Sequence, residues 1–261
     1  ALEHPSCLTL VYSRMQHHYR LHTYFGRYYE AVFLCGVVAG QHTKTGTVAY
    51  ITPKLSYARF TSDINAFAIG VHSVRPDAKV LVVTRDVDPK QMETCEFGVR
   101  HAASLGADTV LTPHYSHLTL AELPYGIFTA LIGIDHEGKP TRYLAAPDWN
   151  WERFYTAMVK SYLNGSLSAL LAMDREESPI ANFWWGLGGG VVDVRLGSWS
   201  SGTPNNLIRY LRGSIARNLY NPFHGPVTDS EGVVRVPAHS DAPPADIIKM
   251  RYIVEGVEII E

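Results

Sequence analysis

The chain has little of what defines several protein classes. It contains three cysteines in 261 residues, Cys7, Cys35 and Cys95. They show no CxxC spacing, and an odd number does not support a disulfide framework, so we interpret them as reduced thiols. It also lacks an apolar run of about 18 residues, so the sequence predicts no membrane span.

Charge of either sign is equally sparse. The formal net charge is −2, and 18% of the residues are charged. A run of about five or six like charges is missing, so nothing predicts binding to nucleic acid. The first residues, ALEHPSC, lack the basic and apolar parts of a secretory signal. Cys7 is therefore not expected to be a lipidated cysteine, and the cellular location stays open.

Signatures of catalysis and of cofactor binding are absent too. There is no GxSxG motif and no HExxH motif, and the GLGGG run is not followed by GKS or GKT. His18 and His22 stand at helical i, i+4 spacing next to His17, but their polar segment favours a solvated crossing over a zinc site. We expect no catalytic residue, no metal and no cofactor.

What the chain does have is a regular alternation of helix and strand between residues 28 and 80. Helical spacing runs from Ala31 to Gly40, and a β-rich run follows at Thr47–Ile51. Apolar residues then recur at i, i+3, i+4 and i+7 from Ile64 to Val71, and Lys79–Thr84 is the next β-rich run. This alternation predicts an α/β fold with parallel sheets flanked by helices.

The remaining segments continue the pattern. A buried strand is expected at 8–12, followed by a polar crossing. Further strands are predicted at 108–111, 127–134, 144–146 and within 183–194, helices at 88–105, 152–163, 203–219 and 245–255, and a hairpin at 225–236.

Several motifs resemble those of one known family. They are EAVFLCGVVAG, KTGTVAYI, INAFAIGVHSVRPDAKV, DWNWERFY, FWWGLGGGVVDV and NPFHGPVTDSEGVV. They are similar to motifs of the basic membrane lipoprotein family, whose members are nucleoside-binding proteins with the type I periplasmic-binding-protein fold. In that family a further segment precedes the part that this sequence matches. The resemblance implies two lobes, with the first lobe incomplete.

The same resemblance implies a function. Residues 1–20 and 147–261 are expected in lobe one, and residues 21–146 in lobe two. The implied protein is a solute-binding component of an ABC importer that binds a small molecule, with a purine nucleoside favoured, between its lobes and presents it to a permease without chemistry. The alternative is a cytosolic sensor of the same fold, in which ligand binding changes contacts with another domain.

Candidate ligand residues follow from the expected sheet, because loops at the carboxyl ends of parallel strands converge on one site. Aromatic rings there can stack on a base, and carboxylates can accept hydrogen bonds from sugar hydroxyls. The candidates are Ser13, Tyr57, Asn65, Arg85, His114, Tyr115, Asp135, Trp149 and Trp185.

Some of these candidates have a second interpretation. Asp135, in LIGIDHE, resembles the family's ribose-binding aspartate but also suits a surface turn. For Trp149 and Trp185, packing between layers is favoured over ligand contact. Asn65 is expected either to touch ligand or to cap a helix.

Overall fold

The computed structural model describes residues 7–13, 22–53, 60–85, 93–113, 129–173, 182–198 and 203–261. The chain forms two compact units. Unit 1 contains residues 1–27 and 149–193, and unit 2 contains residues 28–148 and 194–261. The chain therefore passes from one unit to the other three times. We describe each unit separately.

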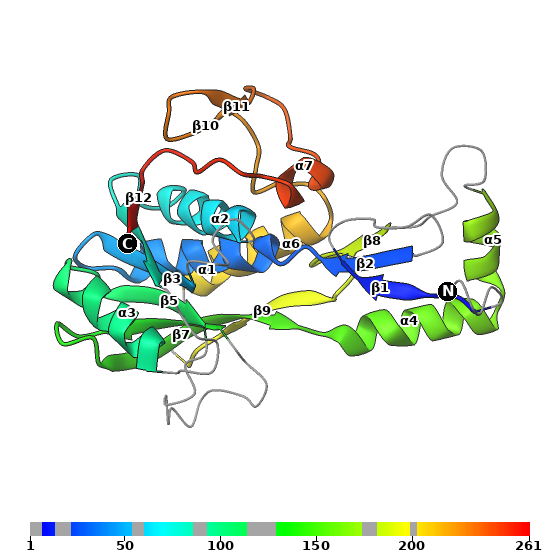
Figure 1. Ribbon diagram of the computed structural model, residues 1–261, viewed down its shortest axis with the longest axis horizontal. Coiled ribbons are helices and arrows are strands. Elements are labelled where there is room, and N and C mark those ends of the chain that lie inside the picture. The colour runs from blue at the N-terminus through cyan, green and yellow to red at the C-terminus, as the bar shows by residue number, and fades with distance from the viewer. Residues whose placement is uncertain are drawn as a thin grey trace. The chain divides into compact units, whose positions relative to one another are not determined.

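Unit 2 is built on a sheet with the strand order β12-β4-β3-β5-β6-β7-β9 (Figure 1). These strands are β12 (Val257–Ile260), β4 (Lys79–Arg85), β3 (Thr47–Pro53), β5 (Thr109–Pro113), β6 (Thr129–Ile134), β7 (Pro140–Trp149) and β9 (Val192–Leu196). β12, β4, β3 and β5 run parallel to one another, whereas β6 is antiparallel to both β5 and β7. The fold is α/β, as the alternation predicts.

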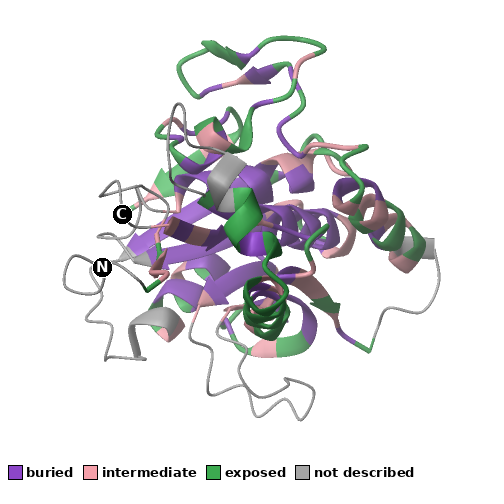
Figure 2. Cartoon of the chain, turned by 90° about the vertical axis from the view of Figure 1, so that its right-hand side faces the viewer, coloured by how far each residue is buried: buried purple, intermediate pink, exposed green. Residues whose placement is uncertain are grey.

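Helices cover both faces of this sheet, as Figure 1 shows for α1 (Tyr29–His42), α2 (Thr61–His72) and α3 (Glu93–Ser104). Successive strand residues point to opposite faces. Ile51 and Ala49 accordingly pack with Val99 of α3, whereas the ring of Tyr50 contacts Phe67 of α2. Figure 2 shows the buried residues gathered in the strands and in the helices that pack on them.

Two glycines let α1 and α2 approach closely. A Cβ atom at Gly36 would lie 2.2 Å from the carbonyl oxygen of Phe67, and one at Gly70 would lie 2.2 Å from that of Phe33. Gly36 is in the middle of α1 and Gly70 is in the last turn of α2. Within a helix, glycine normally lowers stability relative to alanine. Here the missing side chains allow backbone to pack on backbone.

The C-terminal part of unit 2 consists of α6 (Thr203–Ala216), the hairpin β10 (Val227–Thr228) and β11 (Val234–Val236), α7 (Pro244–Ile248) and β12. Asn65 fastens it to α2. Its amide donates to the carbonyl oxygen of Tyr252 at 2.8 Å and lies 3.0 Å from Met250 Sδ, and its side-chain oxygen accepts the N–H of Val254 at 3.1 Å. Because α2 begins at Thr61, Asn65 is not a helix cap.

Unit 1 contains the parallel sheet β1-β2-β8, formed by β1 (Leu10–Tyr12), β2 (His22–Gly26) and β8 (Asn182–Trp185). α4 (Trp151–Leu163) and α5 (Ser166–Met173) complete the unit. Phe154, Met158 and Leu167 of these helices pack with Phe183 and Val191. No helix within the described ranges combines the length and apolar character needed to cross a bilayer.

The structure corrects several sequence predictions. Residues 22–26, expected in a polar crossing, form β2, because their backbone pairs with both β1 and β8. The helix expected at 245–255 ends at Ile248, and the chain then forms β12 on β4. Residues 194–261 group with unit 2, where β12 extends the sheet, and residues 1–20 group with unit 1; the expected division into two lobes stays a prediction. Helix α5 was not predicted.

Candidate functional site

The edge of the seven-stranded sheet at which β3, β4 and β5 end is polar; we call it the carboxyl edge. β6 begins there and β7 ends there, because β6 is antiparallel to both of its neighbours. Since α2 follows β3 and α1 precedes it, both helices begin at the same edge. Buried polar side chains gather at these element ends: Glu30, Thr52, Thr61, Ser62, Asp63, Thr84 and Thr112.

Three threonines contribute hydroxyl groups on neighbouring strands. Thr52 and Thr84 are directly paired in the sheet, and Thr112 stands near the end of β5. The Thr84 hydroxyl donates to the carbonyl oxygen of Ile260 at 3.2 Å. The Thr52 hydroxyl has no hydrogen-bond partner among the described residues. Buried polar groups are usually paired, so this edge offers hydrogen-bonding capacity beyond what the described fold uses.

Tyr28, directly before α1, links this edge to two carboxylates. A side-chain hydrogen bond joins Tyr28 to Thr129. Burial raises the pKa of the Tyr28 phenol, and the nearby negative charges of Asp63 and Asp148 act in the same direction, although the hydrogen bond to Thr129 opposes them. The hydroxyl therefore stays protonated at neutral pH and can donate a hydrogen bond.

Asp148 stands at the end of β7 and forms an ion pair with Arg195 of β9, with 2.5 Å between Oδ2 and Nε. Its side chain is 17% exposed, so it is not fully buried. A carboxylate held in this way can accept hydrogen bonds from sugar hydroxyls or ring N–H groups.

The structure places Asp135 at the other end of the sheet. β6 runs antiparallel to β5, so the residue that follows β6 lies next to Asp108, at the amino end of β5. Asp135 Oδ1 accepts the N–H groups of Glu137 and Lys139 at 2.9 and 2.8 Å. The Lys139 N–H is the main cause of the lowered pKa of Asp135, and burial opposes it. This geometry is that of a turn aspartate.

The other candidates in unit 2 are more dispersed. Asn65 is fully buried and bound to the C-terminal segment, as described above. Arg85 is the last residue of β4, at the carboxyl edge, and its side chain is outside the described part. Tyr57, His114 and Tyr115 lie outside the described residues.

Unit 1 contains the remaining three candidates. The Ser13 N–H donates to the carbonyl oxygen of Tyr24 where β1 ends. Trp149 stacks on Trp151 with ring centroids 4.8 Å apart and an interplanar angle of 10°, and a Cβ atom at Gly26 would overlap its ring. Packing therefore accounts for much of the surface of Trp149.

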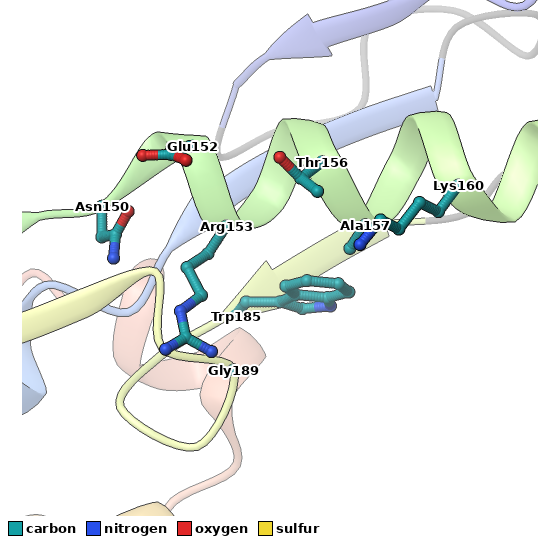
Figure 3. A pocket seen from close by; sticks show the side chains of 8 residues that line it. All are labelled: Asn150, Glu152, Arg153, Thr156, Ala157, Lys160, Trp185 and Gly189. Atoms are coloured by element: carbon teal, nitrogen blue, oxygen red, sulfur yellow. The ribbon is translucent and has the colours of Figure 1, made fainter.

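Trp185, at the end of β8, lines a hollow of about 410 Å³ (Figure 3). The other residues around it are Asn150, Glu152, Arg153, Thr156, Ala157, Lys160 and Gly189. One side of the Trp185 ring meets Phe154 edge-on, with centroids 5.3 Å apart, so the tryptophan belongs to both the core and this hollow.

Metal binding finds no support in the described ranges, where no three His, Cys, Asp or Glu side chains come together. His17 and His18 lie outside those ranges. His22 lies in β2, and burial lowers its pKa. Sequence reasoning missed Tyr28, Asp63 and Thr129 as parts of one site. Thr129 reaches Tyr28 because β6 is antiparallel to β5, which a sequence pattern does not indicate.

The amino-acid sequence is similar to those of two binding proteins. No protein-family model matches the chain. A purine-binding protein of Brucella abortus is 24% identical over 241 residues, which are 90% of this chain and 64% of that protein. A putative ABC transporter glucose-binding protein of Haloferax volcanii is 29% identical over 150 residues, which are 56% of this chain and 37% of that protein.

The fold comparison agrees. A solved ABC transporter solute-binding protein from Conexibacter woesei matches with a TM-score of 0.52 and 10% identity, over 77% of this chain and 65% of that one. The chain is similar in sequence to these two binding proteins and shares the fold of the solved solute-binding protein. The expected likeness to ABC-transporter solute-binding proteins and the periplasmic-binding-protein type of fold are confirmed. The basic membrane lipoprotein family and the incomplete first lobe stay predictions. The chain spans less than two thirds of the length of each of these three proteins.

Proposed function

We propose that this protein binds a purine-containing small molecule, with a nucleoside favoured, as the solute-binding component of an ABC importer. One relative is named as a purine-binding protein and a second as a putative ABC transporter glucose-binding protein. Ligands of open α/β sheets bind at the carboxyl ends of the strands. The permease is the proposed partner, and the protein itself performs no chemistry.

The observation that supports this proposal best is the polar carboxyl edge of unit 2. It combines hydroxyl donors and acceptors, such as Tyr28 and Thr52, with two carboxylates, Asp63 and Asp148. Adjacent sugar hydroxyls suit a carboxylate acceptor, and the N–H and ring-nitrogen groups of a purine suit hydroxyl partners. Of these side chains, we propose Asp148 as the main acceptor, because its side chain is partly exposed and its carboxylate is paired with Arg195.

Asp148 and Asp135 provide a matched test at opposite ends of one sheet. Calorimetric titration with adenosine, guanosine, inosine and cytidine would first identify the nucleoside bound. We then expect Asp148→Asn to weaken binding about tenfold or more, because a hydrogen bond to a charged group contributes about 1.5–3 kcal/mol. Asp135→Asn is expected to leave the affinity within about twofold, since its carboxylate serves the turn.

Two results would contradict the proposal. The function fails if none of the nucleosides binds to the folded protein. The placement of the ligand site at the carboxyl edge fails if Asp135→Asn abolishes binding while Asp148→Asn does not. In that case Asp135 binds the ligand, as its resemblance to the family's ribose-binding aspartate implies. Circular dichroism of both variants ensures that a lost affinity does not reflect lost folding.

A further inference from the structure

The hollow beside α4 in unit 1 has a flat aromatic wall. Figure 3 shows Trp185 lying beneath the helix, close to Ala157 and Lys160, with the loop at Gly189 next to it. A Cβ atom at Gly189 would lie 3.0 Å from Trp185 Cβ, so a glycine at this position lets the loop approach the tryptophan. The volume of about 410 Å³ falls within the range of small-molecule sites, about 300–1,000 Å³.

Two cationic side chains stand on the side of α4 that faces this hollow. Arg153 and Lys160 are seven residues apart, which returns them to the same side of the helix and separates them by about 10 Å along it. Figure 3 shows Arg153 pointing from α4 toward the glycine loop. A Cβ atom at Gly190 would lie 3.6 Å from Arg153 Cδ, which places the guanidinium stem against that loop.

Arg153 and Lys160 have no acidic partner in the part of the chain that the structure describes. Among the described residues around the hollow, Glu152 is acidic and Arg153 and Lys160 are cationic, so the net charge of this described lining is positive.

We propose that this hollow binds a planar organic anion of about mononucleotide size, at a site separate from the carboxyl edge of unit 2. The ring of the ligand stacks on Trp185, and its phosphate or carboxylate group meets the Arg153 guanidinium, whose planar fork suits both groups. Lys160 adds positive charge at the other end of the ring. A base that stacks on an aromatic side chain contributes about 1–3 kcal/mol to the binding of single-stranded nucleic acids. We expect a stacking contribution of similar size here.

The test uses the full chain and four probes in calorimetric titrations: AMP, adenosine, inorganic phosphate and benzoate. We expect an AMP site that persists in the presence of saturating adenosine. Arg153→Gln should weaken AMP at this site about tenfold and leave adenosine within twofold. Arg209→Gln is the matched control, because Arg209 is exposed on α6 of unit 2. Binding of benzoate but not of AMP would identify the anion as a carboxylate.

Trp185→Leu tests the stacking surface, with hydrogen exchange of β2 and β8 amides as a check on folding, since Trp185 also packs on Phe154. The inference is overturned if AMP and benzoate both fail to bind in the presence of adenosine. It is also overturned if Arg153→Gln leaves the affinity of the bound anion unchanged. Asp148→Asn should not change anion binding at this hollow. Failure of the anion-site proposal can therefore be distinguished from failure of the proposed nucleoside site.

Discussion

The contact between α1 and α2 yields a sharp prediction about stability. A Cβ atom at Gly36 would lie 2.2 Å from the Phe67 carbonyl oxygen, whereas ordinary contacts begin at 3.4 Å. The helices would have to separate by 1.2 Å there, which is 3.4 minus 2.2. The atom that is met belongs to the backbone and cannot rotate away. Gly36→Ala should therefore incur the upper end of the overpacking cost, about 3 kcal/mol.

Helix propensity acts in the opposite direction. Alanine is favoured over glycine in a helix interior by about 1 kcal/mol, so the expected net loss is about 2 kcal/mol in the free energy of unfolding. Gly213→Ala in α6 is the control, since a Cβ atom there meets only the flexible end of Arg217 at 3.7 Å. That variant should be stabilised by about 0.5–1 kcal/mol, from propensity alone.

The assay must report on unit 2. Tryptophans 149, 151, 184 and 185 lie in unit 1, so fluorescence mainly follows the other part of the chain. Urea-dependent hydrogen exchange of the α1 amides, such as that of Val37, reports on the correct helix. A Gly36→Ala protein within 0.5 kcal/mol of wild type, or a change of the same sign for both variants, would refute the close-packing argument.

Other predictions concern single polar groups of unit 2. Asn65→Ala should cost about 2–4 kcal/mol, because it leaves the buried N–H of Val254 and the partly buried carbonyl of Tyr252 without this partner. Asn206→Ala, at an exposed position of α6, should be nearly neutral by urea unfolding. Thr52→Val should change the free energy of unfolding by less than about 0.5 kcal/mol, because the Thr52 hydroxyl has no hydrogen-bond partner among the described residues. Thr84→Val should lower the free energy of unfolding by about 1 kcal/mol, because it removes the hydrogen bond to the Ile260 carbonyl oxygen. Burial alone would raise the pKa of Asp229, but hydrogen bonds from Val233, Arg235 and Glu231 lower it below 3.8; its contribution is therefore present above that pH and lost as pH falls through the folded pKa. Asp229→Asn should flatten this acid dependence in urea titrations between about pH 5 and pH 3.

Local patterns predicted the local structure of much of this chain. The spacing of Ile64, Phe67, Ala68 and Val71 indicates α2, and all four residues are buried against the sheet or α1. The β-rich run at Lys79–Thr84 is β4 within one residue. Helix and strand identity follow from periodicity because the buried face of each element repeats with its own period.

Pairing over long distances in sequence was harder to foresee. β12 pairs with β4 although nearly 180 residues separate Ile259 from Val82, and a four-residue strand carries little periodicity of its own. The polar residues around β2 do not predict a strand, yet β2 lies between β1 and β8 in the sheet. In both cases the partner strands, and not the segment itself, determine the structure.

The direction of β6 shows how one such non-local feature changes the reading of a site. The apolar run at 129–134 indicates a strand but carries no information on whether that strand is parallel to β5. If it were parallel, Asp135 would stand at the carboxyl edge. Because it is antiparallel, Asp135 stands at the amino end of β5, and the start of β6 brings Thr129 to Tyr28 at the carboxyl edge. The next strand then runs back and delivers Asp148 to that same edge, beside Arg195. The antiparallel direction of β6 thus places Asp148, and not Asp135, at the carboxyl edge. Comparing ligand binding by the Asp135→Asn and Asp148→Asn variants measures which of the two aspartates contacts the ligand.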